Sequence, residues 1–303
     1  MKRELVHSPA AGRLDSRADG RLDGRLDSRA DSRVYSPANG QAQRVLAQRE
    51  AFPANLEVGN GQIWPIFHST QVDSTNLEAL RLIDSGHHKP LIVVADSQSA
   101  GRCRHKIIWE SPSNLGLWLS FVWFSKVTWA QMPQSTLVLA VAVKEAIKEA
   151  CDLDLGIKWP NDLLGGGKKC AGLLVETAPK SPQKALVLGI GINLSQRCRD
   201  FPISLRDTAT SLGMLSGNFN LSRTKLTFSL AYRIKYWFEK WELEGFTEVR
   251  RAWLKDNLTL GREIVVDNGL PLLAIDLDQS GALVAKTTND QIVTFNTGEI
   301  RFV

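Results

Sequence analysis

Four short polar segments hold the residues best suited to bind and activate a small molecule. In chain order they are Ser74-Thr75-Asn76, the run from Gln98 to Lys106, Lys158-Trp159-Pro160-Asn161-Asp162, and Lys169-Cys170-Ala171-Gly172. Arginine and lysine occur in three of the segments, and their side chains bind phosphate or carboxylate oxygens. The hydroxyl and amide side chains pair with the N–H and C=O groups of a polar ligand. The segments therefore predict a site for an anionic small molecule.

Each segment also has a purely structural explanation. Thr75-Asn76-Leu77-Glu78 has the pattern of a capping box, with Thr75 as the N-cap of a helix and Glu78 reaching back to it. A lysine pair can lie in a solvated turn, and Gly189-x-Gly191 can serve strand packing alone. The order and spacing of the segments, rather than any one of them, therefore indicate a site.

Composition and charge exclude several classes of protein. The chain has 303 residues, of which 43% are hydrophobic, as is typical of a globular enzyme. No apolar run approaches the roughly 20 residues of a membrane-spanning helix, and the start of the chain lacks the apolar core of a signal peptide. We therefore expect a cytoplasmic protein. Residues 1–54 contain ten basic and seven acidic residues and so supply three of the five net positive charges, which argues against a DNA-binding body.

The four cysteines form no Cys-x-x-Cys pair, and no histidine cluster completes a zinc pattern. We therefore expect neither structural zinc nor a disulfide framework, and the sequence identifies no metal ligands.

A repeat of four residues, Arg-x-Asp-x, occupies residues 13–33. In a helix it would place like charges at i and i+4, and it offers too little apolar surface to offset the entropy of ordering. We therefore predict a disordered tail over 1–60, a catalytic domain over 61–257, and a small β-domain over 258–303.

Hydrophobic periodicity and turn residues predict the elements of the two folded parts. Helices are expected from Thr75 to Ile83, from Ser135 to Ala150, and around Leu226–Trp241. Strands are expected at Leu91–Ala95, Leu115–Trp123, Ile157–Leu164, Cys170–Glu176, Ala185–Leu194, Glu263–Val266, Leu272–Asp276, Ala282–Lys286 and Ile292–Phe295.

From about Ile66 onward, the sequence resembles the biotin–protein ligases. The most specific match is Lys158-Trp159-Pro160-Asn161-Asp162-Leu163, followed by Lys169-x-Ala171-Gly172 with Glu176, and by Gly189-x-Gly191-Ile192-Asn193-Leu194. The resemblance implies an α/β (α+β) fold, in which helices flank a central mixed sheet. It also implies that the C-terminal β-domain is an SH3-like barrel.

The resemblance further implies a reaction in two steps. Biotin and ATP form biotinyl-5'-AMP, and biotin then passes to a lysine of a biotin carboxyl carrier domain, expected to be that of acetyl-CoA carboxylase. ATP and Mg²⁺ are the implied cofactors. No DNA-binding role is expected, because the residues before 61 show no helix-turn-helix pattern. The sequence does not decide between a monomer and a homodimer. Two alternatives remain: a lipoate or octanoate attachment enzyme, and a weakly active protein that binds biotin or its adenylate.

Site residues follow from the same resemblance. Lys158 and Arg104 are the expected catalytic cations. The biotin site is expected to contain Ser74, Thr75, Asn76, Gln98, Gly101, Arg102, Arg104, Lys158 and Gly172. The ATP or adenylate site is expected to contain Arg102, Arg104, Trp109, Asn161, Lys169 and Asn193. Asp162 could hold Mg²⁺ through water.

The run from Gly101 to Trp109, here called the arginine segment, departs from the family pattern. Two glycines of the pattern are replaced by Cys103 and Lys106, and two basic residues by Ile107 and Ile108. A left-handed backbone at Cys103 or Lys106 would cost roughly 1 kcal/mol each. We therefore expect an altered backbone path, with both isoleucines packed against the ligand or the core.

Overall fold

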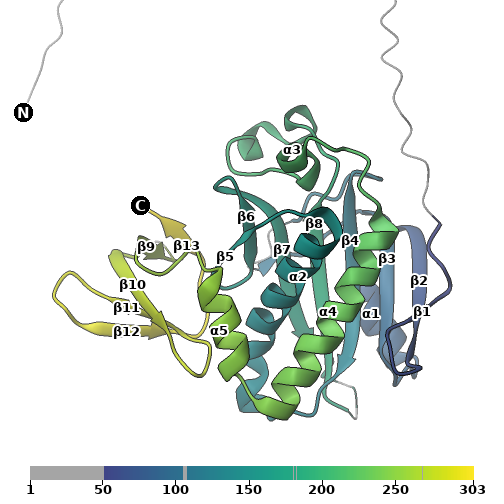
Figure 1. Ribbon diagram of the computed structural model, residues 1–303, viewed down its shortest axis with the longest axis horizontal. Helices are drawn as coiled ribbons and strands as arrows, with labels where there is room; N and C mark the ends of the chain where they lie inside the picture. Colours follow the sequence, from purple (N-terminus) through teal and green to yellow (C-terminus); the bar gives the residue numbers. More distant parts are fainter. Residues whose placement is uncertain (1–50, 105–107, 180, 182, 268) are drawn as a thin grey trace, which may run out of the picture. The chain divides into compact units, whose positions relative to one another are not determined.

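An eight-stranded sheet forms the centre of the fold, with its strands in the order β1-β2-β3-β4-β8-β7-β6-β5 (Figure 1). The computed structural model describes residues 51–104, 108–179, 181, 183–267 and 269–303. The strands are β1 (Asn55–Glu57), β2 (Ile63–Val72), β3 (Leu91–Gln98), β4 (Gly116–Phe124), β5 (Gly156–Lys158), β6 (Asp162–Gly165), β7 (Lys168–Thr177) and β8 (Ala185–Asn193). Strands β2 and β3 run parallel, and the other neighbouring pairs in this sheet run antiparallel. The predicted mixed sheet is confirmed.

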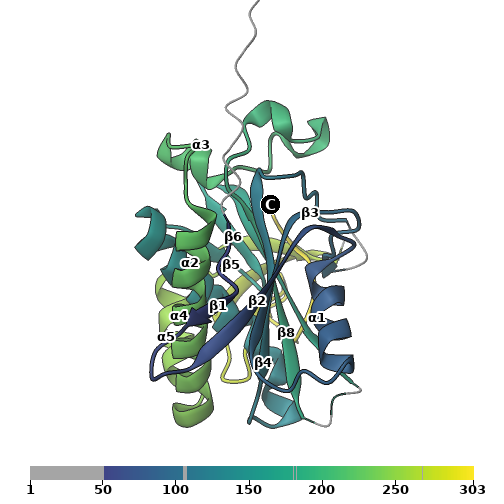
Figure 2. The ribbon, with the colours of Figure 1, turned by 90° about the vertical axis from the view of Figure 1, so that its right-hand side faces the viewer.

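Helices cover both faces of this sheet, and Figure 2 shows α1 on one side with α2 and α4 on the other. The helices are α1 (Thr75–Asp84), α2 (Ser135–Cys151), α3 (Leu212–Ser216), α4 (Arg223–Glu244) and α5 (Thr247–Lys255), and the short 3₁₀ turns are η2 (Trp129–Gln134), η3 (Cys198–Asp200) and η4 (Ile203–Leu205). Among the helices that the structure describes, none has the length and hydrophobicity needed to cross a membrane.

Strand β3 shows why the central strands are apolar at every position. Leu91 and Val93 pack in the cluster on the α1 side, whereas Ile92 and Val94 pack in the larger cluster beneath α2 and α4. Successive side chains of a strand point to opposite faces, so a sheet covered on both faces needs a continuous apolar run.

A second, antiparallel sheet of five strands follows in the order β12-β11-β10-β9-β13. Its strands are β9 (Glu263–Val266), β10 (Pro271–Leu277), β11 (Leu283–Lys286), β12 (Ile292–Phe295) and β13 (Ile300–Phe302). It agrees with the predicted C-terminal β-module. The indole of Trp159 donates to Gly281 O at 3.3 Å and so joins the two sheets, both of which lie in one compact unit, Leu46–Val303. A domain boundary at residue 258 stays a prediction.

The first strand lies earlier than the sequence indicated. Strand β1 lies within the segment 1–60 that we predicted to be disordered, and residues 1–50 of that segment are outside the described residues. Leu56 is buried and β1 pairs with the start of β2, so the sheet includes residues before 61. The apolar contacts of Leu56 and Val58 explain the difference, because both pack in the large core cluster.

Two local expectations were wrong. The predicted strand Ile157–Leu164 is a hairpin of β5 and β6, since Pro160 in the turn has no N–H for a sheet hydrogen bond. The N-cap of α1 is Ser74 rather than Thr75, and Glu78 forms an ion pair with Arg81. Helix α5 and strands β2 and β13 were not predicted.

Leu56→Ala should lower the free energy of unfolding by about 2 kcal/mol, because it removes buried apolar atoms from the core. Urea denaturation measures the change, and Glu57→Ala, at an exposed position of the same strand, is the control. Equal stabilities for the two variants would mean that β1 contributes nothing to the fold.

Candidate functional site

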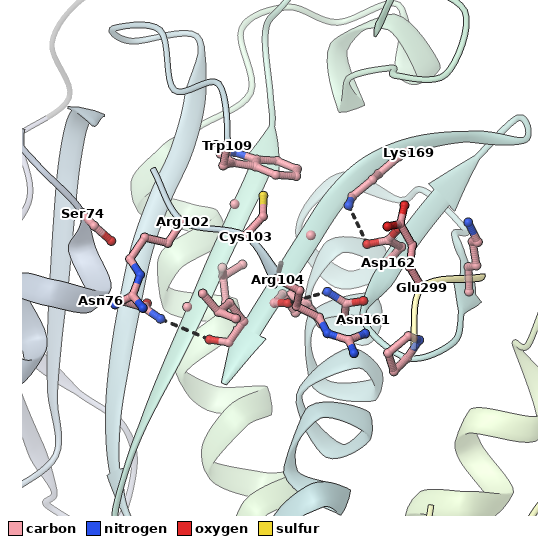
Figure 3. A pocket seen from close by; sticks show the side chains of 18 of the residues that line it. Ser74, Asn76, Arg102, Cys103, Arg104, Trp109, Asn161, Asp162, Lys169 and Glu299 are labelled. Carbon is pink, nitrogen blue, oxygen red and sulfur yellow. Dashed lines mark hydrogen bonds and ion pairs between the residues drawn. The ribbon is translucent and has the colours of Figure 1, made fainter. Parts of the chain in front are cut away.

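A single cavity collects most of the predicted site residues. It lies between the start of α1, strands β7 and β8, the β5–β6 turn, and the turn before β13. Figure 3 shows side chains from these elements directed into it. Its lining consists of Ser74, Thr75, Asn76, Gln98, Arg102, Cys103, Arg104, Trp109, Lys158, Trp159, Pro160, Asn161, Asp162, Lys169, Gly172, Leu173, Leu174, Gly189, Ile190, Gly191, Gly298, Glu299 and Ile300.

Two residues that we predicted for the site do not line this cavity. The buried amide of Asn193 donates to Thr210 O at 3.0 Å and so holds the segment after β8. Gly101 lies behind the wall, where its carbonyl accepts from Trp109 N at 2.9 Å and a Cβ atom would come within 2.4 Å of Trp109 O. Both residues are placed to shape the site rather than to contact a ligand in the cavity.

Uncharged polar groups form the wall beside α1. Both the backbone N and the Oγ1 of Thr75 lie within hydrogen-bond distance of Gln98 Oε1, at 2.8 and 3.2 Å. The Gln98 amide donates to Ser111 Oγ at 2.8 Å. Ser74 is 1% exposed, and its position at the N-cap brings its side chain to the cavity. This wall presents hydroxyl and amide groups, which complement a ligand that carries both N–H and C=O groups.

Trp109 lies against the sheet because two glycines make room for it. Gly172 of β7 and Gly191 of β8 are cross-strand partners, and a Cβ atom on either would lie 2.7 or 2.6 Å from the indole. The ammonium of Lys169 lies 5.2 Å from the ring centroid of the same indole, within cation–π range. Trp109 therefore forms one side of the cavity, and the glycines are needed for its approach.

Four cations from three parts of the chain surround the cavity. Arg102 forms an ion pair with Glu176 at 2.8 Å, and Lys169 forms one with Asp162 at 2.6 Å. Arg104 donates to Gly298 O at 3.1 Å and to the hydroxyl of Thr297, both in the turn between β12 and β13. Burial lowers the pKa of the Arg104 guanidinium from its ordinary value.

Lys158, at the end of β5, differs from the other three cations. Its ammonium lies 5.2 Å from the centroid of the Phe302 ring, and none of the described carboxylates lies within 4 Å of it. Burial lowers its pKa, and this effect outweighs the more distant negative charge of Asp162. A desolvated ammonium with little neutralisation interacts strongly with a ligand anion.

Asn161 fixes the turn that presents Lys158. Its side-chain amide donates to Leu173 O at 2.8 Å, and its backbone carbonyl accepts from Leu173 N at 3.0 Å. These two bonds fasten the β5–β6 turn to β7, so Asn161 is placed to orient the turn as well as to face the cavity.

The altered arginine segment does not pack as we expected. Ile108 is 64% exposed, so the prediction that it packs on the ligand or core was wrong. Trp109, directly after it, takes the inward position against the two glycines. Cys103 lines the cavity with a negative φ and thus avoids the strain of a left-handed backbone. His105, Lys106 and Ile107 lie outside the described residues.

Among the described residues, no group of three or more His, Cys, Asp or Glu side chains could hold a metal ion. Asp162 and Glu299 are the carboxylates that line the cavity, and Asp162 is already paired with Lys169. These residues do not form a magnesium site by themselves.

Several residues that shape the site were missed in the sequence. Gly298, Glu299 and Ile300 reach the cavity from the C-terminal sheet, and no local pattern announces a contact so distant in sequence. Ser120 offered a signal, because it is the one polar residue in the apolar run Leu117–Val122. It lies fully buried, 2.6 Å from Asn76 Oδ1.

Known proteins have sequences similar to this one. The model described as the biotin/lipoate A/B protein ligase family matches residues 68–193. The bifunctional ligase/repressor BirA of Bacillus subtilis is 33% identical over 226 residues, covering 73% of this chain and 69% of that protein. The biotin–[acetyl-CoA-carboxylase] ligase of Paracoccus denitrificans is 30% identical, covering 71% of this chain and 92% of that protein.

A solved structure gives the same result at the level of the fold. The biotin protein ligase from Aquifex aeolicus in complex with biotin and ATP superposes with a TM-score of 0.67 at 29% identity, covering 78% of this chain and 98% of that chain. The predicted fold class is confirmed.

Gly191→Ala should destabilise the protein by about 1–3 kcal/mol, because the new methyl group would overlap the indole of Trp109. The same substitution in a Trp109→Ala background should cost much less, since the overlapping ring is absent. Urea denaturation of the four proteins measures the difference, and additive costs would show that the indole does not lie on Gly191.

The stability contributed by Lys158 should depend on pH. Between its lowered folded-state pKa and the ordinary value of 10.5, the unfolded lysine is protonated and the folded one is not, so the free energy of unfolding rises with pH. Lys158→Met should therefore be more stable than the native protein near pH 7, and this advantage should shrink toward pH 10.5. Urea denaturation across this range checks it, with the exposed Lys255→Met as control; an advantage that stays constant would contradict the lowered pKa.

Proposed function

We propose that this chain, which belongs to the biotin/lipoate A/B protein ligase family, is an ATP-dependent biotin–protein ligase. It activates biotin as biotinyl-5'-AMP and transfers it to a lysine of a biotin carboxyl carrier domain. The observation that carries the proposal is the meeting of Arg102, Arg104, Lys158 and Lys169 around one cavity with an uncharged polar wall.

The polar wall fits the neutral end of biotin. A ureido ring has two N–H donors and one carbonyl acceptor, and the hydroxyls of Ser74 and Thr75 can serve either kind of group. Gln98 is fixed by Thr75 and Ser111, so it holds the wall in shape before the ligand arrives. The carboxylate of biotin then points toward the cations.

The first step joins two anions. An oxygen of the biotin carboxylate attacks the α-phosphorus of ATP, a new P–O bond forms, and the bond to the leaving pyrophosphate breaks. Lys158 and Arg104 stabilise the negative charge on the phosphoryl oxygens, because both line the cavity and both are partly desolvated. Lys169 and Trp109 together are placed to hold the nucleotide.

The second step needs no enzyme nucleophile. The neutral amine of the carrier lysine attacks the acyl carbon of biotinyl-5'-AMP, an amide bond forms as the nitrogen gives a proton to solvent, the acyl–oxygen bond breaks, and AMP leaves. The cations that stabilised the first step also stabilise the departing phosphate, so the protein acts mainly by positioning and charge.

Mg²⁺ enters this proposal as an ion carried by the phosphates of ATP, which supplies further positive charge to the triphosphate. Mg²⁺ commonly keeps several waters and few protein ligands. We propose that Asp162, which lines the cavity, would contact its water shell.

The proposal extends to the acceptor and the setting. The relative from Paracoccus denitrificans is named for acetyl-CoA carboxylase, so we propose that enzyme's carrier domain as acceptor, in the cytoplasm. No DNA-binding role is included, and a homodimer is left to measurement. The catalytic domain would extend from strand β1 (Asn55–Glu57) to residue 257, and the SH3-like module would span 258–303. Lipoate or octanoate attachment is the second candidate, because the family includes lipoate ligases.

Purified protein with Mg-ATP, biotin and a biotin carrier domain should release pyrophosphate and increase the mass of the carrier by that of biotin less one water. Lys158→Met should slow adenylate formation on the order of 10²- to 10³-fold, as expected when a main charge-stabilising group is lost. Lys255→Met, which removes an exposed lysine, should leave the rate unchanged. Transfer of lipoate instead of biotin would favour the second candidate, and binding of biotin without transfer would favour a weakly active binding protein.

A further inference from the structure

A continuous ring of one ion pair and several hydrogen bonds runs around the polar wall and returns to the segment where it started. Arg102 binds Glu176 Oε1, and the Asn76 amide donates to Glu176 Oε2, each at 2.8 Å. Figure 3 shows Arg102 beside Asn76 at this end of the cavity. Glu176 therefore joins a loop cation to the first turn of α1.

From Asn76 the ring continues through the buried hydroxyl of Ser120. Ser120 Oγ lies 2.6 Å from Asn76 Oδ1 and 2.8 Å from Thr75 Oγ1. Thr75 N donates to Gln98, whose amide donates to Ser111 Oγ.

The ring closes on the segment that carries Arg102. Ser111 Oγ donates to Trp109 O at 3.0 Å, and Trp109 N donates to Gly101 O at 2.9 Å. The two ends of the ring thus hold Arg102 and Trp109, although the links between them come from α1, β3, β4 and β7.

The protons of the ring can be placed at its hydroxyls. Ser120 has one proton and two oxygen neighbours, and the amide oxygen Asn76 Oδ1 can only accept, so Ser120 donates to it. The hydroxyl of Thr75 then donates to Ser120, which leaves Gln98 Oε1 to accept from Thr75 N. A lone pair of Thr75 Oγ1 remains free to accept an N–H from a ligand.

This series of hydrogen-bond donors and acceptors ends at the negatively charged carboxylate of Glu176. Its Oε1 forms an ion pair with the Arg102 guanidinium, and its Oε2 accepts from the Asn76 amide. A glutamine there would turn an NH₂ group toward either Arg102 or Asn76, and two donors would then oppose each other. The charge of Glu176, and not only its shape, is required for the ring.

We propose that Glu176 is a positioning residue, which acts through Arg102 and Asn76 to hold Arg102 and Trp109 in their ligand-binding arrangement before biotin arrives. The inference deepens the proposed function and rests on it for the identity of the ligand. The ion pair is partly exposed and adds little to stability by itself. Its contribution is to remove the cost of ordering Arg102 when the ligand binds.

Glu176→Gln should raise the KM for biotin at least tenfold in pyrophosphate release, with kcat changed less than twofold, because ordering is lost equally from the ground and transition states. In an Arg102→Ala background the same substitution should raise KM less than threefold. In the ligand-free protein, amide hydrogen exchange at Trp109 should be faster in Glu176→Gln than in the native protein.

Glu110→Gln removes the same charge from an exposed position near the segment. It should change neither the KM for biotin nor the rate of amide hydrogen exchange at Trp109. Ser111→Ala cuts the other end of the ring and should accelerate exchange at Trp109 by itself, so the ring is tested even if Glu176→Gln fails to fold. Unchanged KM in Glu176→Gln, or unchanged exchange in both variants, would overturn the inference. A native protein that forms no biotinyl-5'-AMP would overturn the proposed function, while the exchange comparison would still decide whether the ring holds Trp109.

Discussion

The approach of Trp109 to the sheet is the contact on which the rest of the site depends. Gly172 and Gly191 face each other across β7 and β8, and together they leave a flat area that the indole fills. Because Trp109 lies on this area, the Lys169 ammonium can lie over its ring, and the backbone N–H of Trp109 can donate to the carbonyl of Gly101. Two residues without side chains thus define the positions of the Trp109 ring, the Lys169 ammonium and the end of the arginine segment.

The cations reach the cavity from elements that are fixed independently. The β5–β6 hairpin, tied to β7 by Asn161, presents Lys158, whereas β7 itself presents Lys169. Arg102 is held by the large sheet and Arg104 by the small one. Since each positive charge has its own support, four like charges can surround one cavity.

Local sequence predicted the parts of the site that depend on short segments. Lys158, Lys169 and the two arginines line the cavity as expected, because strand ends and glycine turns place them. Contacts set by distant pairing could not be predicted: nothing near Glu176 indicates Asn76 as its partner. The error at Thr75 has the same origin, since its hydroxyl is directed at Gln98 and Ser120 rather than at its own helix. Ile108 was misplaced because hydrophobicity alone does not show which of two neighbouring residues turns inward.

The anchor of Arg104 on the small sheet has a consequence for how this chain can vary. One of its acceptors is the backbone carbonyl of Gly298, in a turn that also brings Glu299 to the cavity. A carbonyl acceptor is insensitive to the chemistry of the side chain beside it but sensitive to the length and path of the turn. Insertions or deletions between β12 and β13 would therefore disturb the arginine and the cavity wall at once, even though they would fall almost two hundred residues from the arginine segment.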